Sequence, residues 1–493
     1  MRAFTKMAGR AVAFAVVGAS IAAAQSTNTA QAIDGRWDAT LVSQGQVIPF
    51  RLDIAGSGPT LKGIFYDGKR PNDGTSSATF EDNKLVLRLD QYQTVITATL
   101  QDGKLIGEVS IARPVLSKAA PKPDAAAADA NLSDAERLKR IEFTGNPFGA
   151  SAFQAVRHVN TPVAAPDKVP QIGGSWIIPL SAPSAKGENA FRFIVEQEGA
   201  YVEASILRVD GDTGSYSGTY KDGKWVLSHY DGGRPGLIEV SVALDGSLEI
   251  IQETIVPRRK PAVAQGSGNP AAGSDVASLP VSGRYASKLI AYRPEVEKAK
   301  GFPEPDNYQT HTGVRNPDEV FKFSFPNDHG KLVSNDDPQF KGKVVIAMVT
   351  GTWCPNCHDE AQYLVKLYSK YHSKGLEIVA LDFEEPSQLK SLEREQAFVK
   401  HYGVKYNYLI AGTTAELWDK IPQFTNLNSW PTIIFIGRDG KVKATHTGFA
   451  SPASGEFYTQ LTAEFESNVE KLLAEKPLQD LADARGLPAK VGQ

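Results

Sequence analysis

The chain's only two cysteines lie in the run Trp353–Cys357, which reads WCPNC and follows an apolar segment. The apolar residues 344–349 predict a buried strand, and the small residues after them predict a tight turn into a helix. Cys354 would then begin the helix, where unpaired N–H groups and the helix dipole favour a thiolate. Cys357 would lie one turn further in and less exposed, placed to attack a mixed disulfide. The spacing predicts dithiol chemistry with Cys354 as the attacking sulfur.

The N-terminus predicts export. Residues 1–24 combine basic side chains, an apolar stretch and terminal small residues, as in a cleavable secretory signal. The stretch is shorter than the roughly 20 residues of a membrane span, and we expect no stable span after cleavage. An exported protein meets an oxidising compartment, the periplasm if the host is Gram-negative, where spare cysteines would pair as staples. This chain has none to spare, so reactivity explains the pair better than stability does.

The charge and length of the chain exclude some kinds of partner and predict several domains. The formal net charge of −3 comes from interleaved acidic and basic residues, which leaves no basic stripe for nucleic acid and no polybasic patch for a membrane. A chain of 493 residues predicts two to four domains.

Two stretches of biased composition divide the chain. Residues 114–170 are rich in Ala, Pro and Lys and predict a linker with a short helix, and residues 258–282 predict a flexible linker. Residues 33–113 and 171–257 resemble each other in register, which suggests an internal duplication. Both alternate apolar and polar residues between hairpin turns, so each is expected to be a small antiparallel all-β domain, a β-sandwich or barrel.

The region 283–490 alternates strand and helix patterns. A strand pair near 321–333 precedes the buried strand before the cysteines, and further strands are expected near 376–383, 408–410 and 432–436. A last amphipathic helix is expected near 455–475. This alternation predicts a central sheet with helices on both faces.

The WCPNC run after a buried strand, together with Trp430-Pro431-Thr432 opening a later strand, resembles the thioredoxin superfamily. The extra strands ahead of residue 343 and the segment between 383 and 408 resemble its exported TlpA/ResA (redoxin) branch. The resemblance implies a thioredoxin-like fold, a redox-active disulfide Cys354–Cys357 with no cofactor or metal, and a cis Pro431 that shapes the docking edge. It also implies a thiol-disulfide oxidoreductase that exchanges disulfides with client proteins, and a redox partner that recharges the dithiol.

Glu360 stands where that branch has a functional glutamate, and one turn beyond Cys357 it can reach the sulfurs to move a proton. Its alternative is a solvated glutamate. Three residues are candidates to assist: Trp353, His358 and Trp430. His358 either assists the pair, only tunes its potential or faces solvent, and the bulk of Trp430 predicts a narrow or gated groove. The extension 284–315 has no counterpart in a minimal thioredoxin, and its sequence does not indicate a function.

Other readings remain open. The all-β domains could bind an envelope partner as a scaffold, and a thiol-dependent peroxidase is a nearer enzymatic alternative, although a proline expected shortly before its reactive cysteine is missing. A structural zinc site needs four ligands, and no second cysteine pair exists. The match to the reducing branch favours a reductase, but the direction of electron flow is not set by the two residues between the cysteines.

Overall fold

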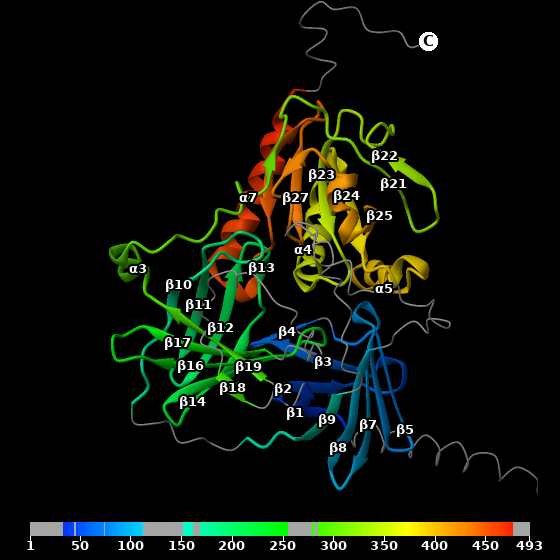
Figure 1. The fold of residues 1–493 in the computed structure, drawn as a ribbon. Coiled ribbons are helices and arrows are strands. Elements are labelled where there is room, and N and C mark those ends of the chain that lie inside the picture. Colours follow the sequence, from blue (N-terminus) through cyan, green and yellow to red (C-terminus); the bar gives the residue numbers. More distant parts are fainter. Residues whose placement is uncertain are drawn as a thin grey trace, which may run out of the picture.

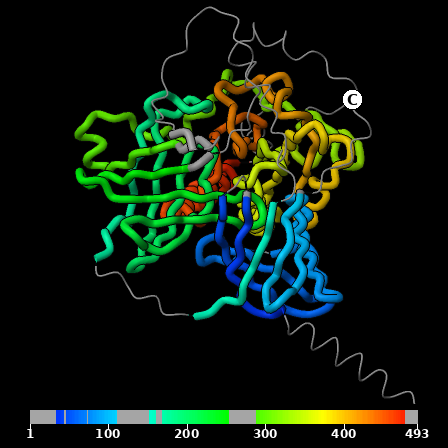
Figure 2. The backbone as a smooth tube through the Cα atoms, turned by 60° about the horizontal axis from the view of Figure 1, so that its bottom comes forward, coloured from blue at the N-terminus to red at the C-terminus, as the bar shows by residue number. Residues whose placement is uncertain are grey.

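The computed structural model describes residues 33–43, 46–72, 74–111, 151–160, 168–254, 279–281 and 284–476. The expected secretory signal lies outside these residues. Figure 1 shows two β-rich units below and an α/β unit above them, and Figure 2 shows the two β-rich units side by side. No helix among the described residues has both the length and the apolar character needed to span a bilayer.

The first β unit comprises the strands β1–β9, in the sheet order β4-β3-β2-β1-β9-β8-β7-β6-β5. Antiparallel hairpins join most neighbours, as the alternating pattern and the Asp-Gly and Asn-Lys turns predict. Its elements are β1 Gly35–Ser43, β2 Gln46–Ala55, η1 Gly58–Thr60, β3 Lys62–Asp67, β4 Arg70–Pro71, β5 Ser77–Glu81, β6 Lys84–Leu89, η2 Asp90–Tyr92, β7 Thr94–Gln101, β8 Lys104–Ile111 and β9 Ser151–Arg157.

The second β unit comprises β10–β19 in the order β10-β11-β12-β14-β15-β16-β17-β19-β18, with β13 beside β12. A bridge between Ile177 of β10 and Tyr292, just after β19, closes the sheet on itself. Its strands are β10 Gly174–Pro179, β11 Ala190–Glu198, β12 Tyr201–Arg208, β13 Gly211–Asp212, β14 Tyr216–Lys221, β15 Lys224–His229, β16 Gly236–Val242, β17 Leu248–Thr254, β18 Leu279–Val281 and β19 Arg284–Ala291.

The two β units share one tryptophan arrangement. The indole N–H of Trp37 donates to the Ile33 carbonyl at 2.8 Å, and that of Trp176 donates to the Ile172 carbonyl at 2.8 Å. An arginine covers each ring, Arg157 at 4.3 Å from the Trp37 centroid and Arg293 at 3.9 Å from that of Trp176. Both tryptophans are buried in the core of their unit.

Two boundaries expected from the sequence are wrong at their edges. Ser151–Arg157, expected inside the linker 114–170, is β9 and pairs with β1 and β8. Arg284–Ala291, expected to open the α/β region, is β19 and pairs with β17, and Leu279–Val281 of the expected linker 258–282 is β18. β9 and the β18–β19 pair follow long inserts, so no hairpin turn ties β9 to β8 or β19 to β17, and local pattern cannot assign these pairings.

The α/β unit follows β19. Its five-stranded sheet has the order β25-β24-β23-β27-β28, with β23, β24 and β25 parallel and β27 and β28 antiparallel to their neighbours. Its elements are α3 Pro294–Lys300, β20 Gly313–Val314, β21 Ser324–Pro326, β22 Leu332–Ser334, β23 Val344–Thr350, α4 Pro355–Tyr371, η3 His372–Lys374, β24 Leu376–Glu384, η4 Gln388–Lys390, α5 Glu393–Tyr402, β25 Asn407–Thr413, η5 Thr414–Glu416, α6 Leu417–Lys420, β26 Phe424–Thr425, β27 Thr432–Ile436, β28 Val442–Thr447, η6 Pro452–Ser454 and α7 Glu456–Ala474.

Strand β23 is buried on both faces, as its unbroken apolar run predicts. Ile346 and Met348 pack into one cluster with residues of α4, α5 and α7, whereas Val345 and Ala347 pack into the other with α6 and the phenylalanines before β22. The first cluster also contains Ile194 and Leu207 of the second β unit. The α/β unit and the second β unit therefore share one hydrophobic core.

Candidate active site

The two cysteines lie at the N-terminus of α4. Cys354 is the N-cap residue in an extended conformation, Pro355 occupies the first helical position, and Cys357 lies one turn further in. Proline suits that position because its missing N–H has no helical partner there. Both thiols are free; Cys354 is 5% exposed and Cys357 is 0% exposed. Cys354 is therefore the sulfur nearer to solvent.

The surroundings shift the pKa values of the two thiols in opposite directions. Burial opposes ionisation of Cys354, but hydrogen bonds from the Cys357 thiol and backbone N–H, and the charge of Arg234, outweigh burial and lower the Cys354 pKa. Burial raises the pKa of Cys357 well above its usual value, and the Cys354 thiolate adds to the rise. The first charge on the pair therefore belongs to Cys354.

Glu360 is fully buried one turn beyond Cys357, and neither of its carboxylate oxygens has a hydrogen-bond partner among the described residues. Burial, and then the charge of Cys354, raises its pKa well above 4.5. It also contributes to the raised pKa of Cys357. The alternative of a solvated glutamate is wrong, because the helix turns this side chain into the protein.

Two tryptophans flank Cys354. The Trp430–Pro431 peptide bond is cis, and the Cys354 thiol donates to the Trp430 carbonyl at 3.3 Å. The rings of Trp353 and Trp430 lie 5.5 Å apart, and the Trp353 indole N–H donates to the Phe383 carbonyl at 2.9 Å. These contacts place aromatic walls beside the outer sulfur.

His358 neither faces solvent nor hydrogen-bonds to a sulfur in the described structure. Its Nε2 donates to the Thr352 carbonyl at 2.8 Å, and its Nδ1 accepts from the Tyr402 hydroxyl at 2.8 Å. Tyr92 of the first β unit stacks on the ring at a centroid distance of 4.2 Å. Burial lowers its pKa to about 3, so the neutral ring supports the turn before the cysteines rather than titrating beside them.

A buried ion pair that the sequence reading missed also supports this turn. Glu384 accepts from the Thr352 backbone N–H at 2.7 Å and from the Thr352 hydroxyl. Arg394 of α5 donates to Glu384 at 2.6 Å and to Thr352 Oγ1 at 2.8 Å. A carboxylate at the end of a buried strand was the available signal, but its partner lies on another element.

The second β unit reaches the cysteine motif itself. Asn356, between the cysteines, donates to the Asp210 carbonyl at 2.8 Å and accepts from Arg234 at 3.3 Å. Asp212 accepts from the Ser451 backbone N–H at 2.5 Å and from its hydroxyl at 3.0 Å. A Cβ on Gly211, at φ +116°, would lie 2.3 Å from the Phe449 carbonyl oxygen. Residues 210–212 thus form a docking loop between the second β unit and the α/β unit.

A cavity of about 580 Å³ lies beside Cys354, between the α/β unit and the second β unit. Trp353, Trp418 and Trp430 line it on the α/β side, and Arg208 and Arg234 line it on the other. It is of the size that a drug-sized ligand fills. Cys354 therefore faces a cavity between the two units rather than a flat surface.

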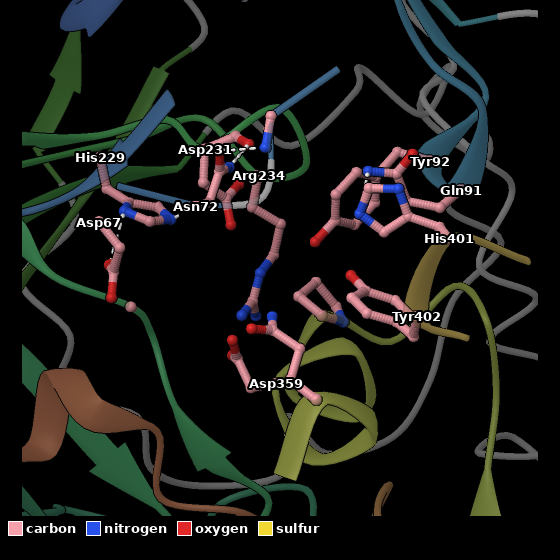
Figure 3. A pocket seen from close by; sticks show the side chains of 14 residues that line it. Asp67, Asn72, Gln91, Tyr92, His229, Asp231, Arg234, Asp359, His401 and Tyr402 are labelled. Carbon is pink, nitrogen blue, oxygen red and sulfur yellow. Dashed lines mark hydrogen bonds and ion pairs between the residues drawn. The ribbon is translucent and has the colours of Figure 1, made fainter. Parts of the chain in front are cut away.

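A second, polar cavity of about 50 Å³ lies where all three units meet (Figure 3). Asp67 and Tyr92 come from the first β unit, Asp231 and Arg234 from the second, and Asp359 from α4. In Figure 3, Arg234 extends from the loop after β15 toward α4. Within the described part of the chain, no group of three or more His, Cys, Asp or Glu side chains is arranged to hold a metal ion.

Comparison with known proteins gives the following similarities. Residues 315–461 match the Redoxin family model. The chain is 36% identical over 143 residues to the thiol-disulfide oxidoreductase ResA from a strain of Bacillus cereus, a match that covers 29% of this chain and 75% of the relative. It is 38% identical over 127 residues to ResA of Bacillus thuringiensis subsp. konkukian, covering 25% of this chain and 65% of that protein. The chain thus spans about two thirds of the length of these curated relatives. A putative thiol:disulfide interchange protein DsbE from Chlorobium tepidum is a similar solved structure, at 22% identity and a TM-score of 0.24, covering 30% of this chain and 97% of that chain.

Proposed function

Since this chain belongs, through its C-terminal region, to the TlpA/ResA-type redoxins, we propose that it is a thiol-disulfide oxidoreductase that reduces disulfides of client proteins through Cys354 and Cys357. The observation that carries the proposal is the placement of the two thiols at the start of α4, with Cys354 at the N-cap and nearer to solvent and Cys357 fully buried one turn further in. A pair of this kind provides one nucleophile and one protected resolving thiol.

In the first step the Cys354 thiolate attacks one sulfur of a client disulfide. A new bond forms between Cys354 Sγ and that sulfur, the client S–S bond breaks, and the other client sulfur leaves as a thiolate that takes up a proton. The negative charge on Cys354 is consumed in this step.

That loss of charge prepares the second step. Apart from burial, the Cys354 thiolate holds up the pKa values of both Cys357 and Glu360, so forming the mixed disulfide lowers both. Glu360 then gives its own proton to the departing client thiolate, and the resulting carboxylate accepts the Cys357 proton. The Cys357 thiolate attacks Cys354 Sγ, the Cys354–Cys357 bond forms, and the second client sulfur is released; two electrons have passed to the client.

The cavity beside Cys354 bears on the clients. It is lined by tryptophan rings on one side and by residues of the second β unit on the other, and its volume of about 580 Å³ suits a short extended segment. An extended segment can also pair its backbone with the edge near Pro431. We therefore assign as substrates disulfides that lie in flexible or unfolded segments.

The proposal also covers export of the protein, its redox partner and the role of the β units. Residues 1–24 support export, and an exported reductase needs a partner that recharges its disulfide. The matching Trp–Arg pairs of the two β units support an origin by duplication. Because the second β unit lines the cavity beside Cys354, we assign client selection to this unit.

The test is disulfide reduction by the full chain and its serine variants. Reduced wild type should reduce insulin, Cys354→Ser should not, and Cys357→Ser should accumulate a mixed disulfide through Cys354. The equilibrium potential against glutathione then sets the direction. A potential near about −120 mV would mark an oxidant and overturn the reductase assignment. A scaffold would instead keep its partner after both serine substitutions, and a peroxidase would turn over peroxide faster than protein disulfides.

A further inference from the structure

The loop between β15 and β16 carries one arginine to the cysteine motif. Arg234 Nη2 donates to Asn356 Oδ1 at 3.3 Å, and Asn356 is the residue directly ahead of Cys357. Arg234 and Cys354 also line the same cavity. A guanidinium from another unit is thus held against the turn that presents the outer sulfur.

The other charges around Cys354 leave Arg234 as the effective cation. Cys357 and Glu360 face the thiol from α4, and neither supplies positive charge. On the second β unit, Lys186 is paired with Asp210, and Arg208 lies over the Phe191 ring at 5.2 Å. In the described structure, no carboxylate forms an ion pair with Arg234, although Asp231 and Asp210 lie near enough to act on its pKa.

Arginine keeps its charge at any pH that the protein meets. Its field at the cysteine is stronger than it would be in water, because Cys354 is buried and little solvent screens it. Of the groups that favour the Cys354 thiolate, Arg234 is the one formal positive charge; the other contributions are hydrogen bonds within the pair.

We propose that Arg234 is a positioning residue of the second β unit that stabilises the Cys354 thiolate, so that the dithiol site is complete only when this unit is docked. The proposal rests on the proposed function for its catalytic meaning, but the ionisation of Cys354 is measurable without any client. Stabilising the reduced dithiol also makes the pair more oxidising, so removing the charge should make it more reducing.

The experiment measures the pH dependence of alkylation of Cys354 by iodoacetamide in the full, reduced chain, with the modified cysteine identified by mass spectrometry. Arg234→Gln removes the charge and keeps a hydrogen-bond donor for Asn356. Arg234→Lys restores the charge. Arg208→Gln is the matched control, because it removes an equal charge from the same cavity.

We expect Arg234→Gln to raise the apparent pKa of Cys354 and to slow alkylation near neutral pH about tenfold for each unit of that rise. Arg234→Lys should recover most of the rate, and Arg208→Gln should change it less. A profile for Arg234→Gln that superimposes on wild type would overturn the proposal, as would an equal effect of Arg208→Gln. Thermal unfolding of each variant separates misfolding from loss of charge.

Failure of the proposed function gives a different pattern. If no variant, wild type included, reduces insulin while Arg234→Gln still shifts the alkylation profile, the role of Arg234 stands and the oxidoreductase assignment falls. If insulin is reduced normally and the profile does not move, the assignment stands and the role of Arg234 falls.

Discussion

Replacing Glu360 with glutamine should stabilise the α/β unit by an amount that grows as the pH rises. The side chain is 0% exposed, and its carboxylate oxygens have no hydrogen-bond partner among the described residues. Burial, and then the charge of Cys354, raises its pKa well above 4.5. The folded protein therefore keeps this proton over a pH range in which the unfolded chain has released it.

The direction follows from the protons bound in each state. Above 4.5, the usual pKa of the group, the unfolded chain binds fewer protons than the folded one, so the free energy of unfolding falls as the pH rises. The fall is about 1.4 kcal/mol for each pH unit, and it ends once the pH passes the raised pKa of the folded state. Glutamine has nearly the same size and stays neutral, so the variant avoids this loss.

Hydrogen exchange of the amides of β23 measures the opening of this unit, because the strand is buried along its whole length. Comparing variant with wild type at each pH cancels the intrinsic exchange rate. Between about pH 5 and about pH 7 the advantage of Glu360→Gln should grow by up to about 2.7 kcal/mol. The Cys354→Ser background, which lacks the thiolate, isolates the share due to burial.

A stability difference that stays constant between these two pH values would refute the reasoning. It would mean that the carboxylate is already ionised and solvated in the folded protein. Glu360 would then hold no proton to give to the client thiolate, and the charge of Cys354 would not control its ionisation.

Three further outcomes are expected. Arg394→Met leaves the fully buried Glu384 without its guanidinium. The free energy of unfolding, measured with urea, should fall by about 3–5 kcal/mol. A fall below about 1 kcal/mol, the level of an exposed pair, would contradict the buried ion pair. Gly211→Ala places a methyl group 2.3 Å from the Phe449 carbonyl oxygen and should weaken docking of the second β unit by about 1–3 kcal/mol. The backbone amides of the docking loop should then exchange hydrogen faster. An unchanged exchange rate would disprove the contact. Asn356→Ala removes the hydrogen bond to the Asp210 carbonyl and should weaken docking by about 1 kcal/mol, measured by the same hydrogen exchange. The control is Asn335→Ala, in a turn remote from the cysteine motif, which should leave exchange in the docking loop unchanged.

Local pattern was enough to predict the elements that carry the cysteines. The unbroken apolar run predicted β23, and the small residues and Pro355 predicted where α4 begins. Strand and helix periods are properties of neighbouring residues, which is why β21, β22, β27 and α7 also lie close to the expected ranges. The order of the two thiols in exposure follows from the same helix geometry.

The partners of those elements came only from the tertiary structure. Strand β9 meets β1 and β8, and β19 meets β17, across long inserts, so no short turn links these pairs. Arg394 meets Glu384, and Tyr92 meets His358, from elements that the sequence pattern treats as unrelated.

The chain by itself determined that a dithiol stands at a helix start, because three residues of spacing set one turn of helix whatever surrounds it. It did not determine the environment of that dithiol. Arg234, the docking loop around Gly211 and the other residues of the second β unit that line the cavity beside Cys354 lie more than one hundred positions earlier in the sequence. Their effect depends on burial and on distance through space, and packing of the three units sets both.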